Sequence, residues 1–184
     1  MFEFLSQEEL ERIMNKEFTI KRLEVVRDIF CFCSFTGLAF IDVKQLNPTH
    51  LVTDSNGSLW VRKPRQKTGN MCNIPVIHSA KVILDKYKDH PEYLKNNVLL
   101  PVLSNQKMNS YLNEIADLCE ITKKLSTHVA RHTAATVVFL ANNVSIENVA
   151  KMLGHSSTKM TQHYAKVLDS SILRDMQQVE AKFG

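Results

Sequence analysis

Two short segments in the C-terminal third of the chain carry side chains that could act together on a phosphodiester. His128 and Arg131 are three residues apart, so on a helix they project from the same face. His155 and Tyr164 follow, nine residues apart. A tyrosine oxygen can attack phosphorus without metal or ATP, and an arginine with imidazoles can hold the phosphate oxygens. These side chains therefore fit the extra negative charge that develops in such a transition state.

Each segment alone also has a purely structural interpretation. A histidine and an arginine three residues apart occur by chance at solvated helix starts, and a lone tyrosine on a helix more often packs than attacks. The phenol has an ordinary pKa of about 10, so it needs nearby cations or a base to attack at neutral pH. The order of the two segments, rather than either one alone, favours the chemical interpretation.

A basic run lies between two predicted turns. Residues 62–67 read Arg-Lys-Pro-Arg-Gln-Lys, which places four cations in six positions. In structural terms, such a run is a solvated strand edge that discourages pairing with other chains. In functional terms, it is a hairpin that reaches DNA through Arg62, Lys63 and Arg65. Pro64 would interrupt strand pairing nearby, which leaves the local register open.

The periodicity of apolar residues predicts the elements that must position these side chains. Asn56-Gly57 and Thr68-Gly69-Asn70 mark tight turns between strands at 50–53, 59–61 and 73–77. The sequence therefore predicts an α+β fold that is mainly helical and has a small three-stranded antiparallel sheet. A short helix is predicted through Ile41 and Val43. Longer helices are predicted at 7–16, 21–35, 79–88, 105–119, 127–142, 146–153, 157–168 and 169–182.

Composition and charge limit the class of protein. The chain has 184 residues, of which 44% are hydrophobic, so one ordinary domain with a core is expected rather than disorder. The formal net charge of +4 fits an anionic partner such as DNA but does not establish one. Apolar runs are far shorter than the roughly 20 residues of a membrane span, and the charged N-terminal residues do not form a signal peptide. We therefore expect a cytoplasmic protein with no membrane segment.

The cysteines show no metal-binding pattern. None of them forms a CxxC pair, and no spacing among them suits zinc. No metal-ligand grouping surrounds Arg131 or the acidic Asp42 either, so we expect no metal. We interpret the four as reduced, mostly buried thiols: Cys31, Cys33, Cys72 and Cys119.

Taken together, the two C-terminal segments resemble the tyrosine recombinase, or phage integrase, family. Residues 127–133 match the family's HxxR box, and Leu153-Gly154-His155 followed by Tyr164 resembles its LGH-then-Tyr box. The resemblance covers about residues 4–170. It implies a catalytic domain that cuts and rejoins DNA through a 3′-phosphotyrosyl intermediate, for integration or excision of a mobile element.

The resemblance also implies a role for each side chain. Tyr164 would be the nucleophile, Arg131 would hold non-bridging oxygens, and His128 and His155 would donate hydrogen bonds and help to move the proton. The family carries a catalytic lysine in a hairpin, commonly followed by threonine. Lys67-Thr68 matches this pattern best, as the group that protonates the leaving oxygen, and Lys63 is the second choice.

One further box departs from the family's pattern. In the segment from Thr36 to Asp42, the family's acid is present as Asp42, which we expect to be structural, but Ala39 occupies the position of its arginine. Alanine cannot bind phosphate, so either the box only packs the core or an active enzyme recruits another cation. Arg27, on the preceding helix, is the first candidate, and an ion pair with a surface acid is its alternative role. The alternative function is accordingly a catalytically impaired DNA-binding module of the same fold.

The resemblance extends to partners and organisation. It implies double-stranded DNA at recombination sites as the partner, exchange of bonds without ATP or any cofactor, and four protomers on two duplexes. We expect one catalytic domain over residues 1–184, without the family's N-terminal core-binding domain and therefore a fragment, monomeric when free and bound to the bacterial nucleoid. The tail helix would expose an apolar stripe that docks on a neighbouring protomer or on its own domain: Ile172, Met176 and Val179. A type IB topoisomerase uses similar residues, but the small domain and the LGH box favour the recombinases.

Overall fold

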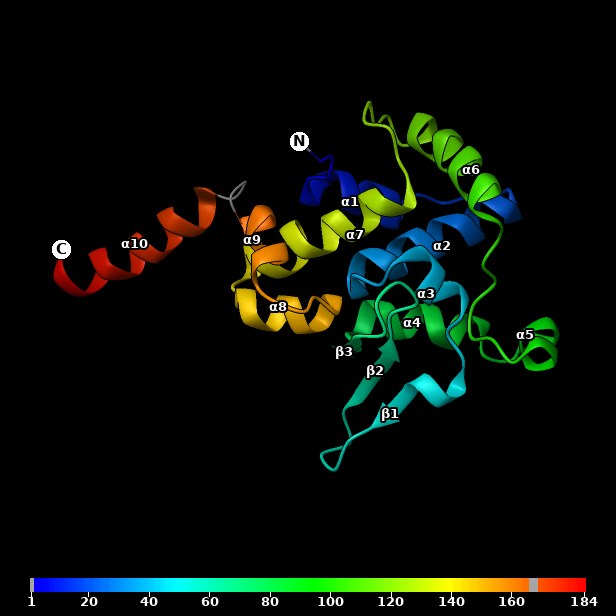
Figure 1. Ribbon diagram of the computed structural model, residues 1–184. Coiled ribbons are helices and arrows are strands. Elements are labelled where there is room, and N and C mark those ends of the chain that lie inside the picture. Colours follow the sequence, from blue (N-terminus) through cyan, green and yellow to red (C-terminus); the bar gives the residue numbers. More distant parts are fainter. Residues whose placement is uncertain (1, 166–168) are drawn as a thin grey trace.

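The structure, a computed structural model, describes residues 2–165 and 169–184 and is mainly helical (Figure 1). The predicted α+β architecture is confirmed. Short helical turns, η1, η2 and η3, occupy Pro48–His50, Ala134–Phe139 and Leu140–Asn142. The α-helices are α1 (Gln7–Asn15), α2 (Lys21–Thr36), α3 (Phe40–Lys44), α4 (His78–Tyr87), α5 (Pro91–Asn96), α6 (Asn105–Leu118), α7 (Thr127–Thr133), α8 (Ile146–Leu153), α9 (Lys159–Ala165) and α10 (Asp169–Phe183).

The sheet has three antiparallel strands in the order β1-β2-β3, which are Leu51–Thr53, Leu59–Pro64 and Met71–Pro75. Val61 of the central strand faces Leu51 on one side and Ile74 on the other. β2 continues three residues beyond its predicted end, and its last residue, Pro64, pairs with Met71. Because Pro64 ends the strand, its missing N–H interrupts little of the ladder.

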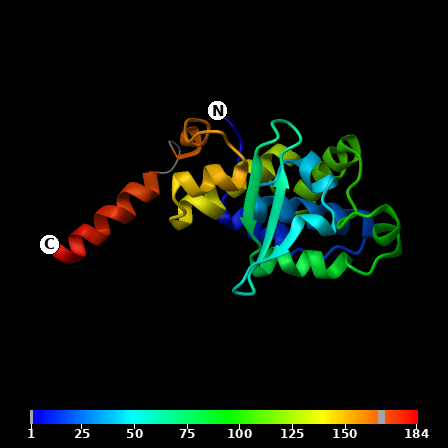
Figure 2. The ribbon, with the colours of Figure 1, turned by 60° about the horizontal axis from the view of Figure 1, so that its bottom comes forward.

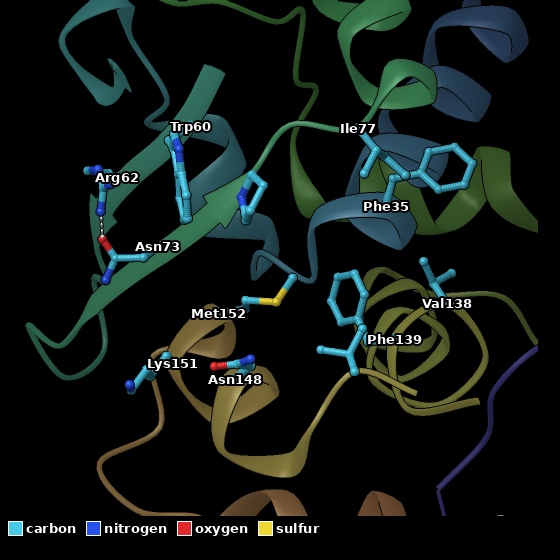
Figure 3. A pocket seen from close by; sticks show the side chains of 12 residues that line it. Phe35, Trp60, Arg62, Asn73, Ile77, Val138, Phe139, Asn148, Lys151 and Met152 are labelled. Carbon is cyan, nitrogen blue, oxygen red and sulfur yellow. Dashed lines mark hydrogen bonds between the residues drawn. The ribbon is translucent and has the colours of Figure 1, made fainter. Parts of the chain in front are cut away.

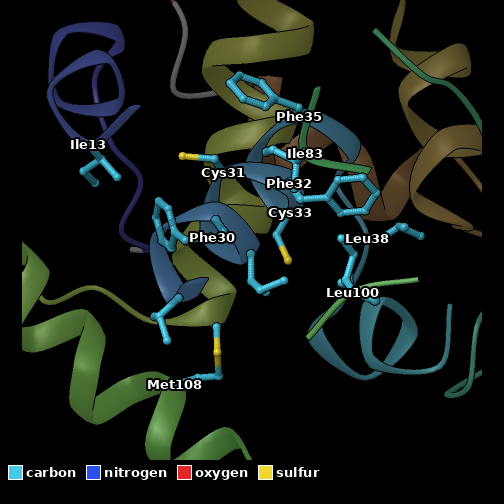
Figure 4. Close-up of a cluster of buried hydrophobic side chains, with 14 of the residues drawn as sticks. Ile13, Phe30, Cys31, Phe32, Cys33, Phe35, Leu38, Ile83, Leu100 and Met108 are labelled. Atoms are coloured by element: carbon cyan, nitrogen blue, oxygen red, sulfur yellow. The ribbon is translucent and has the colours of Figure 1, made fainter. Parts of the chain in front are cut away.

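Helix α2 forms the centre of the core. Every residue from Asp28 to Thr36 is buried, so this half of the helix is enclosed on all sides by other elements. Its large side chains, among them Phe30 and Phe32, meet those of the surrounding elements in one apolar cluster, in which Leu38 lies near Leu100 (Figure 4). The four cysteines are buried and free, as predicted. A rigid α2 fixes the elements that pack on it, including α7.

The helical path predicted at 127–142 is continuous but not one α-helix. The α-helix ends at Thr133, and η2 continues as π-helix before η3. The hydroxyls of Thr133 and Thr136 donate to the carbonyls of Val129 and His132, one turn earlier. These side-chain bonds compete with the regular backbone pattern, which favours such a local change of helix type.

Other elements differ from the predictions, among them β3, which was predicted at 73–77 and spans Met71–Pro75. The six-residue helix α5 was not predicted, because it is too short to show a periodic pattern. The helix predicted at 157–168 begins at Lys159 and is described as far as Ala165, so its last three predicted residues lie outside the described residues. The predicted tail helix is present as α10, which leads away from the rest of the chain (Figures 1 and 2).

Candidate active site

Helix α7 places Arg131 in the interior of the domain. The side chain is 8% exposed, and its Nη1 donates to the Gly37 carbonyl at 2.6 Å while Nη2 donates to the Leu153 carbonyl at 2.9 Å. Gly37 caps α2 and Leu153 ends α8, so the guanidinium joins the C-terminal ends of two helices to α7. The negative ends of the helix dipoles favour a cation at this position.

His155 is positioned by a turn that requires glycine. Gly154 ends α8 with a φ of 71°, and a Cβ atom built there would lie 2.7 Å from Cδ of Arg65. The next residue, His155, directs Nδ1 toward the hydroxyl of Thr161 on α9, at 2.6 Å. Burial has the largest effect on the pKa of His155, and the charges of Arg131 and Arg65 act in the same direction. Together they lower this pKa to about 4. The imidazole is therefore neutral at pH 7.

Tyr164 lies on α9 and is almost completely covered. Its side chain is 4% exposed, and the ring of Phe2 lies against it with the ring centroids 4.9 Å apart. Burial raises the pKa of Tyr164, whereas the charges of Arg131 and Arg65 act in the opposite direction. In this conformation Tyr164 is a protonated phenol within the field of two guanidinium groups.

Two of the predicted catalytic side chains lie at the surface instead. His128 is exposed at the start of α7, where its ring stacks on that of His132 with centroids 6.4 Å apart. It also lines a cavity of about 510 Å³ together with Ser126 and Asn109. Lys67 is exposed in the turn between β2 and β3. The structure thus brings Arg131, His155 and Tyr164 into one cluster and leaves the other two outside it.

The predicted DNA-binding residues of the hairpin point in different directions. Arg62 donates to Asn73 Oδ1 at 2.7 Å, and its guanidinium carbon lies 4.5 Å from the ring centroid of Trp60. Lys63, the next residue, faces the other side of the sheet and is only 4% exposed. Its ammonium is 2.8 Å from Asp42 Oδ1. This buried ion pair contradicts the predicted DNA contact of Lys63, because the ammonium is not available to a phosphate.

Asp42 fixes the turn that follows β2. Besides the ammonium of Lys63, its Oδ1 accepts a hydrogen bond from the Gln66 backbone at 2.8 Å. This bonding fits the structural role predicted for the acid. Arg65, immediately before Gln66, is 9% exposed and packs its aliphatic stem against Gly154. The turn therefore delivers Arg65 to the arginine–histidine cluster.

Arg27 lies elsewhere. Its Nη1 donates to the carbonyls of Ile13, Met14 and Lys16, and its Nε pairs with Asp28 at 2.9 Å. These bonds close the C-terminal end of α1, which packs against α2. This geometry contradicts the prediction that Arg27 compensates for the missing arginine, because its Nη1 is committed to carbonyls at the end of α1 and its Nε to Asp28 of α2.

A cavity of about 650 Å³ lies between the sheet and α8 (Figure 3). Its walls are mostly apolar, with Trp60, Phe139 and Met152 among the lining side chains and Arg62 and Lys151 at its edge. None of the predicted catalytic residues lines it, so this cavity is separate from the cluster around Arg131.

The family model described as "Phage integrase family" matches residues 3–171. The chain belongs to the phage integrase family. Among curated proteins, the chain is 48% identical over 50 residues to tyrosine recombinase XerC of Caldanaerobacter subterraneus. The matched segment covers 27% of this chain and 14% of that protein. It is 40% identical over 65 residues to a tyrosine recombinase of Agathobacter rectalis, covering 35% and 21%. The matches therefore span a minor part of each curated relative.

Solved structures of recombinases share the fold of this phage integrase family member. XerH site-specific recombinase, bound to palindromic difH substrate in a post-cleavage complex, superposes with a TM-score of 0.75 at 18% identity. That match covers 97% of this chain and 53% of XerH. The lambda integrase catalytic core superposes with a TM-score of 0.62 at 21% identity, covering 84% of this chain and 92% of that one. At these identities, the likeness establishes the fold.

Two members of the cluster have little or no local signal in the sequence. Thr161 contacts the imidazole of His155 and is fully buried, and its only sequence signal is its place between the LGH box and Tyr164. The basic run predicts Arg65 to lie on a DNA-facing hairpin, whereas its side chain packs on Gly154. Nothing local in the sequence marks that contact, since it forms only when the turn meets the end of α8.

The low pKa of His155 predicts an acid-sensitive fold. The pKa is about 6.5 in an unfolded chain and about 4 in the folded one, so the unfolded chain binds more protons between these values. The free energy of unfolding should be at its full value above about pH 6.5 and fall as the pH drops toward 4. Burial also lowers the pKa of His132 and His50, which act in the same direction. We expect His155→Asn to lose less stability than the wild type when the pH is lowered from 7.5 to 5.

Urea unfolding followed by circular dichroism at both pH values measures this difference. The exposed His78→Asn variant serves as the matched control, and it should keep the wild-type pH dependence. An unchanged pH dependence in His155→Asn would show that His155 titrates in the same way in the folded and unfolded chains.

No group of three or more His, Cys, Asp or Glu side chains within the described ranges is arranged to hold a metal ion. Of the helices in the part of the chain that the structure describes, none has the length and apolar character to cross a lipid bilayer.

Proposed function

We propose that this chain is the catalytic domain of a site-specific DNA recombinase that cleaves and rejoins DNA through Tyr164. The observation that carries the proposal is the convergence of Arg131 from α7, His155 from the turn after α8, and Tyr164 from α9, in a chain of the phage integrase family. A tyrosine hydroxyl, a fixed guanidinium and a neutral imidazole in one cluster support this proposal. These are the components that metal-independent attack on a phosphodiester requires.

In the proposed reaction, the phenol of Tyr164 gives up its proton to solvent as its oxygen attacks the scissile phosphorus, and the bond from phosphorus to the 5′ oxygen breaks. The products are a 3′-phosphotyrosyl link and a free 5′ hydroxyl. Arg131 offsets the charge on the non-bridging oxygens, and Lys67 gives a proton to the leaving 5′ oxygen. Attack by a 5′ hydroxyl from the second duplex reverses the step and rejoins the strands. One phosphodiester replaces another, so neither ATP nor a cofactor takes part.

The imidazoles act as hydrogen-bond donors in this scheme. When the Thr161 hydroxyl donates to Nδ1, the neutral His155 keeps its proton on Nε2 and offers it to a phosphate oxygen. His128, exposed at the start of α7, supplies a further donor from the surface side once DNA is bound. We propose both donor roles, for His155 and for His128, because these residues lie on either side of Arg131 in the sequence.

The covered position of Tyr164 requires a movement before cleavage. A side chain that is 4% exposed and lies under Phe2 cannot reach a phosphate on a DNA backbone. We propose that DNA binding separates these two rings and exposes the phenol. The exposed turn that carries Lys67 closes on the leaving group at the same stage.

Double-stranded DNA at a recombination site is the proposed partner. Neighbouring structures include a lambda integrase tetramer bound to a Holliday junction, which supports four protomers on two duplexes as the working assembly. Exchange at the ends of a mobile element, carried out in the bacterial nucleoid, is the setting we propose. Ala39 favours a second candidate, a DNA-binding module without chemistry, because it removes one expected phosphate ligand.

A nicked suicide duplex separates the two candidates. The nick releases a short fragment after cleavage, so a covalent intermediate accumulates and migrates slowly on a denaturing gel. The recombinase proposal predicts this adduct for the wild-type chain on a duplex that carries the element's end. Retention of that duplex on a native gel without any adduct would favour the binding module.

The tail helix α10 should contribute to assembly. Apolar side chains lie exposed along it, and its Arg174 donates to the carbonyl of Ala141 near its start. Deletion of residues 170–184 should leave binding of a single duplex largely intact and impair complete recombination, because the exposed apolar side chains fit a neighbouring protomer. Full recombination by the truncated protein, in an assay that scores both strand exchanges, would reject this role. The apolar side chains are Ile172, Leu173, Met176, Val179 and Phe183.

A further inference from the structure

The cluster around Arg131 lacks one phosphate ligand. Two of the N–H groups of Arg131 are committed to the carbonyls of Gly37 and Leu153. Ala39, the N-cap residue of α3 that follows shortly after Gly37, offers no polar side chain. The charge that develops on two non-bridging oxygens therefore needs a second fixed donor, and loss of one such donor costs about 10²–10³ in rate.

The turn after β2 holds Arg65 in a fixed place beside this cluster. The Arg65 backbone N–H donates to the Asn70 carbonyl and its own carbonyl accepts from Gly69 N–H, both at 2.8 Å. Asp42 holds the Gln66 backbone at 2.8 Å, and the Asn70 side chain donates to the Gly154 carbonyl at 3.3 Å. The turn is thereby tied both to α3 and to the residue before His155.

The Arg65 side chain is buried without a partner for its Nε atom. It is 9% exposed, and no hydrogen-bond acceptor among the described residues reaches that nitrogen. An unsatisfied buried donor is costly, and an arginine without a function usually extends its head into water instead. The aliphatic part of the Arg65 side chain packs on Gly154, and this contact keeps the guanidinium from extending into water.

The electrostatics of the cluster agree with this geometry. Burial lowers the pKa of Arg131, and Arg65 is the charged neighbour with the largest further lowering effect. Arg65 also acts on the pKa of Tyr164 and of His155, so its charge lies close to both groups. Two guanidinium groups held together repel each other until an anion lies between them.

We propose that Arg65 is the second phosphate-binding arginine of this site and, with Arg131, holds the scissile phosphodiester in place of the side chain that Ala39 lacks. The proposal rests on the function proposed above. It assigns the free donor of a buried guanidinium to the one anion that the reaction brings into the cluster. It also explains how a chain with alanine at position 39 retains two guanidinium groups for two non-bridging oxygens.

Substitution of Arg65 should slow cleavage strongly when the scissile phosphate is charged. We expect Arg65→Ala to reduce the rate of adduct formation on the suicide duplex by about 10²–10³ at saturating protein. A second substrate carries a neutral methylphosphonate at the scissile position, where there is less charge to offset. On it, Arg65→Ala and the wild type should cleave at similar rates. A structural defect would slow both substrates equally, and that result would overturn the proposal, as would wild-type cleavage of the phosphodiester.

The exposed Lys88→Ala variant is the control for loss of one positive charge, and it should cleave both substrates like the wild type. A binding measurement separates failure of this proposal from failure of the proposed function. In a Tyr164→Phe background, no chemistry occurs, and the protein should bind the phosphodiester duplex more tightly than the methylphosphonate duplex. Arg65→Ala should reduce that preference. If the preference persists undiminished, Arg65 does not contact the scissile phosphate, whether or not the wild type forms an adduct.

Discussion

Tyr164→Phe should eliminate the covalent protein–DNA adduct while the protein continues to bind the duplex. The substitution removes only the attacking oxygen and keeps the ring that packs against Phe2. Loss of a nucleophile lowers rates by about 10⁴-fold or more, so no adduct should be visible on the timescale of the wild-type reaction. A denaturing gel of the nicked duplex measures the adduct, and fluorescence anisotropy with the same duplex measures binding.

The unfolding midpoint of Tyr164→Phe provides the control for that experiment, because it should stay close to that of the wild type. An adduct formed by Tyr164→Phe at the wild-type rate would assign the nucleophile to a different residue. Loss of binding together with the adduct would instead assign Tyr164 to the fold.

Arg131→Ala should have the second largest effect, and it should act on both activity and stability. Its guanidinium is expected to offset charge in the transition state, so cleavage should fall by about 10²–10³ or more. The substitution also leaves the carbonyls of Gly37 and Leu153 without their donor, which costs about 2–6 kcal/mol of unfolding free energy. Single-turnover cleavage rates and urea midpoints measure the two effects separately.

Arg131→Lys provides the matched comparison. It keeps the charge but cannot donate to both carbonyls in the same geometry, so it should recover part of the stability and little of the cleavage rate. Wild-type cleavage by a folded Arg131→Ala protein would remove Arg131 from the proposed mechanism.

Much of the fold follows from local signals. The capping box of Ser6 and Glu9 begins α1, Ser126 and Ser145 cap α7 and α8, and Gly154 ends α8 in the left-handed conformation. Each of these signals lies within a few residues of the boundary that it determines. The π-helical segment η2 and the short α5 were not predicted, because hydroxyl bonds to the preceding turn and a six-residue helix leave no periodic pattern.

The candidate site was predictable only in part. Arg131, His155 and Tyr164 stand in motifs whose order is visible in the sequence, and the structure brings them together. The surroundings of Arg27 and Arg65 depend on tertiary contacts between segments far apart in the sequence. The carbonyls at the end of α1 engage Arg27, whereas the turn after β2 carries Arg65 to Gly154. Charge and spacing alone could not distinguish these two arginines.

Burial also decides which cations of the basic run at residues 62–67 are exposed. Alternation along β2 directs Arg62 and Lys63 to opposite faces of the sheet, and only one of these faces is closed by α3. Arg62 and Lys63 therefore do not share one surface of the sheet. The sequence shows the number of charges but not which of them lies against Asp42.

The central claim, that DNA is joined to this chain through Tyr164, can be tested by mapping the covalent linkage. The wild-type protein is trapped on the nicked duplex, treated with nuclease and trypsin, and analysed by mass spectrometry. Trypsin cleaves after Lys159 and Lys166, so the account predicts a nucleotide mass on the peptide of residues 160–166, localised to Tyr164. A nucleotide on a peptide that contains Tyr87, Tyr93 or Tyr111, or a bound duplex with no modified peptide at all, would contradict it.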